Sequence, residues 1–143
     1  MMTREDGIIR RLSELAVQLK DPAVVSLYLF GSVGEGRAHR ESDVDVGLLL
    51  SWDRCPTARE RFELRLEWSS RLGAALEGRS PDVVILNDAP PGLGRAIVTG
   101  GRRIYCSDPE ADHAYVRDVQ LRAADLEPFL RRARQVKLDA ISR

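Results

Sequence analysis

Two short apolar segments on either side of a polar, glycine-rich stretch constrain the fold of this chain most strongly. Residues 24–30 (VVSLYLF) and 43–50 (DVDVGLLL) have the length and the β-branched or aromatic content of buried strands. Residues 31–42 (GSVGEGRAHRES) contain three glycines, which predicts a loop, or a loop that opens into a short helix. The sequence therefore predicts a strand–loop–strand unit whose apolar strands the other elements must cover.

Apolar residues at helical spacing, together with capping residues, predict the helices. The predicted helices span residues 4–20, 57–77, 93–99 and 109–141, the last broken or restarted at Pro128. Thr57 is the expected N-cap of the second helix. The expected buried faces consist of Ile8, Ile9, Leu12, Leu15, Ala16 and Leu19 in the first helix, and of Phe62, Leu66, Leu72 and Leu76 in the second.

Two further strands complete the predicted sheet, over residues 81–87 and 102–106. Two strands in succession, followed by helices that alternate with strands, predict an α/β (α+β) fold. We expect a mixed sheet of about four strands with helices packed on it, largely on one side. The length suits a single domain, residues 1–143, in which 109–143 forms a C-terminal helical extension.

Charge and cysteine content narrow the classes of partner. Lys+Arg and Asp+Glu number 22 each, so net charge does not point to nucleic acid or an anionic membrane, and we expect no direct nucleic-acid partner. Cys55 and Cys106 stand in no metal-ligand spacing and are expected to be reduced thiols. The longest apolar run, residues 44–50, is too short to span a bilayer, so we expect a cytoplasmic protein.

Three carboxylates at the starts of predicted strands indicate a metal site. Asp43 and Asp45 are two residues apart on a strand, so their side chains point to one face, with Cβ atoms roughly 6–7 Å apart. Asp82 opens a later strand and lies beside them if the two strands are neighbours. Converging carboxylates repel each other unless a cation lies between them, and Mg²⁺ prefers such oxygen ligands. Three carboxylates are enough to hold two Mg²⁺ ions for nucleotidyl transfer.

Gly31 and Ser32, directly after the first strand, are typical of a phosphate-binding turn. A glycine lets the backbone approach a ligand, and backbone N–H groups with a serine hydroxyl bind phosphate. Arg37 and Arg40 could add positive charge near a triphosphate. The segment is neither a G-x-x-x-x-G-K-[ST] phosphate loop nor a G-x-G-x-x-G dinucleotide loop.

The residues Gly31-Ser32, Gly36 and Ser42-Asp43-Val44-Asp45 together resemble the G-S-x-x-x-G…S-D-x-D signature of the DNA polymerase β-like nucleotidyltransferase superfamily. Asp82 matches the third carboxylate of that family. The short length is similar to that of the minimal nucleotidyltransferases, called MNT or MntA-like, which act as antitoxins beside a HEPN-domain toxin. Glu35 departs from the signature, because the family often has an arginine there.

This resemblance implies roles for the individual residues. The nucleotide would be bound by Gly31, Ser32 and Ser42. Two Mg²⁺ ions and the catalytic function would depend on Asp43, Asp45 and Asp82, the last also a possible base toward the attacking hydroxyl. The implied reaction transfers AMP from ATP to a tyrosine hydroxyl of a cognate HEPN-type RNase toxin. The toxin would be neutralised in this way, in a hetero-oligomer with its antitoxin.

Two other functions stay open on the sequence alone. A small-molecule nucleotidyltransferase, such as one acting on an aminoglycoside, usually has a separate C-terminal helical domain, and only residues 108–143 follow Ser107. A non-catalytic antitoxin or binding module would act by occlusion and would not need three carboxylates. A basic cluster is either a solvated helix face or a contact for an acidic partner or a tRNA-like surface, and it consists of Arg131, Arg132, Arg134 and Lys137.

Overall fold

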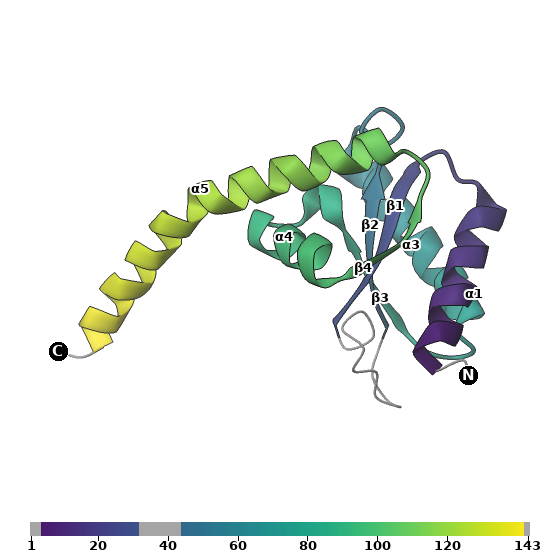
Figure 1. The fold of residues 1–143 in the computed structure, drawn as a ribbon, viewed down its shortest axis with the longest axis horizontal. Helices are drawn as coiled ribbons and strands as arrows, with labels where there is room; N and C mark the ends of the chain where they lie inside the picture. Colours follow the sequence, from purple (N-terminus) through teal and green to yellow (C-terminus); the bar gives the residue numbers. More distant parts are fainter. Residues whose placement is uncertain (1–3, 32–43, 142–143) are drawn as a thin grey trace.

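The computed structural model describes residues 4–31 and 44–141. In chain order the elements are α1 (Arg4–Leu19), β1 (Val24–Phe30), β2 (Val44–Leu50), α3 (Ala58–Ala75), β3 (Pro81–Ile85), the 3₁₀ turn η1 (Leu86–Asp88), α4 (Pro91–Gly100), β4 (Arg102–Cys106) and α5 (Pro109–Ile141) (Figure 1). The predicted strands and helices are confirmed, with several boundaries shifted by one or two residues. The third strand ends at Ile85 because η1 follows, and α4 begins at Pro91, a residue whose fixed φ suits the first turn of a helix.

The four strands form one mixed sheet in the order β3-β2-β1-β4. β1 is antiparallel to both β2 and β4, whereas β2 and β3 are parallel. A parallel pair needs a long crossover connection, and α3 supplies it. This arrangement confirms the predicted mixed sheet of four strands.

Helices cover both faces of the sheet (Figure 1). On one face α1 and α3 pack over a large core that includes Leu12 and Trp68. On the other face α4 and α5 pack over a smaller cluster that includes Tyr28 and Ile97. The prediction that helices lie largely on one side was therefore wrong. The reason is visible in β2, where residues 46–50 are all buried, so that both faces of the strand need an apolar cover.

The buried faces of α1 and α3 were predicted with different success. All six residues predicted for α1 are buried or partly buried against the large core. In α3, Leu72 is buried as predicted, but Phe62 and Leu66 are exposed, so their assignment to the core was wrong. Arg61 and Trp68 lie on the buried face of α3 instead.

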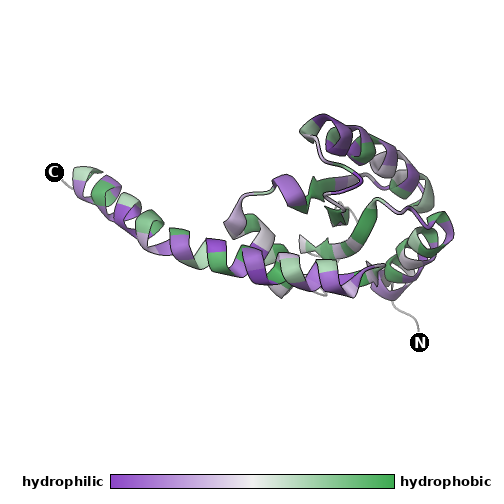
Figure 2. Ribbon diagram, turned by 90° about the horizontal axis from the view of Figure 1, so that it is seen from above, coloured by the Kyte–Doolittle hydropathy of each residue, from purple (hydrophilic) through white to green (hydrophobic). Residues whose placement is uncertain are grey.

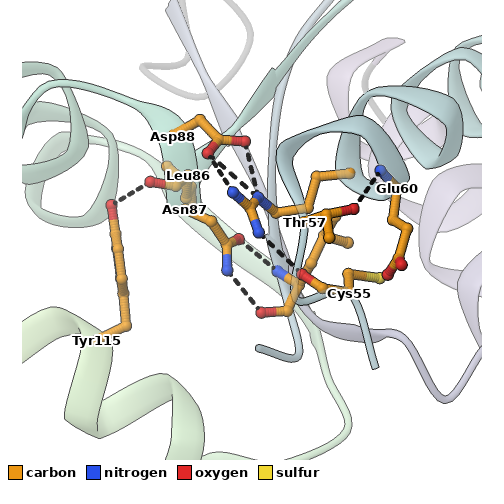
Figure 3. A network of polar contacts seen from close by, with 9 residues as sticks. Cys55, Thr57, Glu60, Leu86, Asn87, Asp88 and Tyr115 are labelled. Carbon is orange, nitrogen blue, oxygen red and sulfur yellow. Dashed lines mark hydrogen bonds and ion pairs between the residues drawn. The ribbon is translucent and has the colours of Figure 1, made fainter. Parts of the chain in front are cut away.

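A buried arginine fixes this orientation of α3. Arg61 donates from Nη2 to the Asp88 carboxylate at 3.0 Å and from Nη1 to the carbonyl of Cys55 at 2.9 Å (Figure 3). The hydrogen bond to Asp88 raises the pKa of Arg61, so the guanidinium stays charged and paired within the fold. One turn earlier, the predicted N-cap is confirmed, because the Thr57 hydroxyl accepts from the N–H of Glu60 at 3.1 Å (Figure 3).

A second buried charge anchors the start of α5 to the sheet. Asp112 accepts hydrogen bonds from the hydroxyls of Ser26 and Tyr28 on β1, at 2.5 and 2.7 Å, and from Nη1 of Arg103 on β4 at 2.8 Å. Burial, followed by the hydrogen bond to this carboxylate, raises the pKa of the Tyr28 phenol well above its usual value. α5 therefore begins beside the start of β1, at the end of the sheet that lies away from the C-terminal end of that strand (Figure 1).

α5 is one helix from Pro109 to Ile141 and passes through Pro128. The predicted interruption at Pro128 was therefore wrong. The helix bends in its C-terminal half (Figure 1), since a proline removes one backbone hydrogen bond and its ring crowds the preceding turn. Ala123 is its last buried residue. Within the described part of the chain, no helix is both long and apolar enough to traverse a bilayer.

Candidate active site

Three strand ends meet at one edge of the sheet. β1 ends at Phe30, while β2 and β3 begin at Val44 and Pro81. Because β1 is antiparallel to β2 and β2 is parallel to β3, these three ends lie together (Figure 1). The register places Asp45 opposite Phe30 and Asp82 opposite Asp45. The expectation that Asp82 lies beside Asp45 is thus met.

Asp45 and Asp82 form a carboxylate pair across two parallel strands. Residues paired in this way point to the same face, on strands about 4.8 Å apart. Asp45 is partly buried and Asp82 is exposed, so the pair is open to solvent on one side. Two carboxylates so close repel each other, and a hard divalent cation between them relieves the repulsion. The donor set therefore fits Mg²⁺, which usually takes one or two protein carboxylates and completes its shell with phosphate and water.

Gly31 lies against this pair. Its φ of +71° falls in the left-handed region that favours glycine. A Cβ atom built on Gly31 would overlap Oδ2 of Asp45 and would lie 3.2 Å from its Cγ. The bare backbone of Gly31 thus packs directly on the Asp45 carboxylate, and any larger residue would displace that carboxylate. Such a close approach suits a phosphate held between the turn and a metal ion.

Several predicted site residues fall outside the described residues, namely Ser32, Glu35, Arg37, Arg40, Ser42 and Asp43. Within residues 4–31 and 44–141, no three His, Cys, Asp or Glu side chains converge on one point as a metal-binding group. Asp45 and Asp82 would supply two ligands, so a site for two Mg²⁺ ions depends on the predicted third ligand, Asp43. The roles of Gly31, Ser32, Ser42, Asp43, Asp45 and Asp82 stay predictions.

A cleft of about 510 Å³ runs along β3, with Asp82 among its lining residues. Phe62 and Arg65 of α3 line one wall, and Leu93 of α4 lines the other. β3 is an edge strand, and Nε of Arg65 donates to the carbonyl of Val83 at 2.9 Å, which satisfies part of its outer edge. The sequence analysis missed this cleft because it placed Phe62 in the core. The cleft arises from the convergence of α3 and α4 on β3, which hydrophobic periodicity in the sequence does not predict.

Comparison with known protein families identifies a match to this chain. Residues 14–110 match the family Polymerase beta, Nucleotidyltransferase. The chain belongs to the polymerase beta nucleotidyltransferase family. The family resemblance predicted from Gly31-Ser32 and the D-x-D segment is therefore confirmed, and so is the nucleotidyltransferase fold.

Relatives of this nucleotidyltransferase include an antitoxin enzyme. The chain is 28% identical over 100 residues to the protein adenylyltransferase MntA of Shewanella oneidensis, which corresponds to 70% of this chain and 67% of that protein. A crystal structure of a toxin–antitoxin with AMP-PNP matches with a TM-score of 0.66 at 24% identity, covering 94% of this chain and 98% of the other. These matches confirm the resemblance to the MntA-like proteins.

A further solved structure contains a modified toxin. It holds tri-AMPylated Shewanella oneidensis HEPN toxin in complex with the MNT antitoxin. The match has a TM-score of 0.62 at 20% identity and covers 97% of this chain and 99% of the matched chain. At this identity the match is evidence for a shared fold.

Proposed function

We propose that this nucleotidyltransferase is a Mg²⁺-dependent protein adenylyltransferase that acts as an antitoxin. It transfers AMP from ATP to a tyrosine hydroxyl of a cognate HEPN-type RNase toxin, and it works in the cytoplasm in a hetero-oligomer with that toxin. The observation that carries the proposal is the in-register pair of Asp45 and Asp82 against Gly31, in a chain of this family. The name of the MntA relative and the AMP-PNP and AMPylated-toxin complexes of similar structures support it.

The residues around the carboxylate pair have separable tasks in this reaction. Asp45 and Asp82, with Asp43, hold Mg²⁺, which when bound neutralises the charge of the triphosphate. The Gly31 turn binds the phosphates, together with Ser32. The tyrosine oxygen attacks the α-phosphorus, the bond from that phosphorus to the pyrophosphate oxygen breaks, and pyrophosphate leaves with the bonding electron pair. Asp82 accepts the phenolic proton, since it is the exposed member of the described pair.

The acceptor reaches this site through the cleft along β3. Phe62 and Leu93 offer apolar walls for an aromatic ring, and Asp82 offers a carboxylate for the hydroxyl. A phenol matches this combination of apolar wall and polar end better than a sugar, which would need hydrogen-bonding groups along its whole length. The cleft therefore favours a tyrosine acceptor over an aminoglycoside.

The decisive experiment mixes the protein with the HEPN-type protein encoded beside it, Mg²⁺ and α-labelled ATP. We expect label on a tyrosine of the toxin, and none when the Mg²⁺ is chelated. Asp45→Asn should reduce the rate of AMP transfer about 100-fold or more, because it weakens the electrostatic stabilisation of the transition state. Asp53→Asn, which removes an exposed carboxylate beyond the other end of β2, is the matched control and should be as active as wild type.

Two results would overturn this proposal. Label on an aminoglycoside but not on the toxin would identify a small-molecule nucleotidyltransferase. Tight toxin binding without any transfer, unchanged in Asp45→Asn, would identify a non-catalytic binding module.

A further inference from the structure

The C-terminal half of α5 leaves the body of the protein. Residues 124–141, called the arm here, follow the last buried residue, Ala123, and extend roughly 27 Å at about 1.5 Å per residue (Figure 1). Every residue of the arm is exposed except Glu127, whose Oε2 lies 3.9 Å from Nη1 of Arg95 on α4. A helical segment of this length is marginal in water unless something packs on it.

The arm carries an apolar stripe at coiled-coil spacing. Its members recur at alternating steps of three and four residues, and they are Leu126, Phe129, Ala133, Val136 and Ala140. Phe129 is 63% exposed and Val136 is 69% exposed. With Ala133 they line an open, largely apolar hollow on the arm. Figure 2 shows apolar and polar residues interleaved along this helix. An apolar repeat of 3.5 residues is the pattern that packs against another helix.

The charged residues beside the stripe determine what kind of helix can pack on it. Arg132 and Lys137 flank the middle of the stripe on its two sides, Arg131 and Arg134 lie close by, and no acidic residue lies between Glu127 and Asp139. A second copy of the chain, packed parallel and in register, would set Arg132 against Lys137. An antiparallel pair centred on Ala133 would set Arg132 of one copy near Arg132 of the other. Like charges opposed in this way disfavour self-association, whereas a helix with carboxylates beside its apolar stripe would complement the arm.

We propose that the arm is the docking helix for the toxin, and that it receives a toxin helix whose apolar stripe is flanked by Asp or Glu. This inference rests on the function proposed above for its choice of partner. The docked arm tethers the toxin to the enzyme, so the acceptor tyrosine arrives at a high effective concentration. Loss of docking should therefore weaken toxin binding and raise the KM for toxin, while kcat and the KM for ATP stay unchanged.

The arm can be tested without disturbing the body of the protein, because its apolar side chains are exposed. The test variant is Phe129→Ser/Val136→Ser, and the matched control is Leu121→Ser, which alters a residue on the same helix that is 62% exposed but lies outside the arm. Titration calorimetry with the intact HEPN-type protein should show at least tenfold weaker binding for the double variant and wild-type binding for the control. Arg132→Glu/Lys137→Glu should also weaken binding, and less so at high salt.

The outcomes separate this inference from the proposed function. Equal binding of wild type and Phe129→Ser/Val136→Ser would overturn the docking role, even if AMP transfer is observed. Absence of transfer together with arm-dependent binding would overturn the proposed function and leave the docking role standing. Sedimentation would reveal the rival occupant, since a wild-type dimer that becomes a monomer in Phe129→Ser/Val136→Ser would mean that a second copy covers the stripe.

Discussion

At the scale of single residues, the site depends on one contact between a backbone and a carboxylate. Gly31 holds a left-handed conformation, and the space that a side chain would fill there is taken by Asp45. Backbone conformation and carboxylate position are thus set by the same residue. A substitution at Gly31 alters both the backbone conformation and the carboxylate position, and a control variant at another glycine can separate the two effects.

We expect Gly31→Ala to reduce AMP transfer by about 100-fold, because displacing a catalytic group by about 1 Å has an effect of that size. The strain of a left-handed alanine should also cost about 1–2 kcal/mol of stability. Gly78→Ala is the control, since Gly78 has φ +90° and no atom within 4 Å of the position of an added Cβ. Thermal unfolding should report a loss for both variants, at least as large for Gly31→Ala, and transfer assays a loss for Gly31→Ala alone. Full activity of Gly31→Ala would refute this account.

The sequence predicted much of the site at this scale and missed one part of it. Asp45 and Asp82 were predicted because each lies at the start of a strand whose following residues are apolar. The register of the two strands places them side by side. Phe62 was misplaced, because periodicity assigns apolar residues to the buried face and cannot foresee that Arg61 is buried through its bonds to Asp88.

At the scale of elements, the packing of α5 involves a buried phenol. The hydroxyl of Tyr115 donates to the carbonyl of Leu86 at 3.2 Å and links α5 to η1 (Figure 3). Burial raises the pKa of Tyr115 from its ordinary value of 10 to about 12. The folded protein therefore prefers the neutral phenol more strongly than the unfolded chain does. Its contribution to stability is complete below pH 10 and is lost as the pH rises through 12.

We expect Tyr115→Phe to lower stability at pH 8 by about 0.5–1.5 kcal/mol, the usual net worth of one hydrogen bond. Because phenylalanine does not titrate, the variant should lose less stability than wild type between pH 10 and 12. Urea unfolding followed by tryptophan fluorescence at several pH values measures both effects. Parallel stability curves for the two proteins above pH 10 would show that Tyr115 does not titrate with unfolding.

The cleft between α3, β3 and α4 leads to a prediction about the acceptor. Phe62→Ala should raise the KM for toxin about tenfold, equivalent to roughly 1.4 kcal/mol, and leave the KM for ATP unchanged. Leu66→Ala is the matched control, because Leu66 is 55% exposed and Phe62 is 53% exposed on the same helix, but only Phe62 lines the cleft. Steady-state transfer with varied toxin tests this. Equal KM values for the two variants would remove the cleft from the acceptor path.

Element boundaries were easier to predict from the sequence than their packing. Strands β1 and β4 begin and end where their apolar and β-branched residues predicted. The cover on both faces was not predicted, because the choice between one-sided and two-sided packing depends on where α4 and α5 return to the sheet. The continuity of α5 through Pro128 was missed as well, since local propensity disfavours proline within a helix.

At the scale of the whole molecule, ligand binding and folding are linked. A ligand that binds only the folded chain, at 100 times its Kd, stabilises it by about 2.7 kcal/mol. For a chain of this length the Tm should rise by roughly 9 °C. We expect AMP-PNP with Mg²⁺ to produce such a shift in scanning fluorimetry, and AMP-PNP with a chelator to produce little. Asp45→Asn should remove the shift and Asp53→Asn should keep it. A shift that survives Asp45→Asn would place the nucleotide elsewhere.

The parallel pairing of β2 with β3 also has a consequence for the newly made chain. Synthesis delivers the chain from its N-terminus, so Gly31 and Asp45 leave the ribosome well before Asp82. The carboxylate pair cannot form until α3 has emerged and has carried Pro81–Ile85 back alongside β2. A partly made chain thus has an incomplete set of carboxylates. The proposed transfer of AMP would therefore require the assembled sheet.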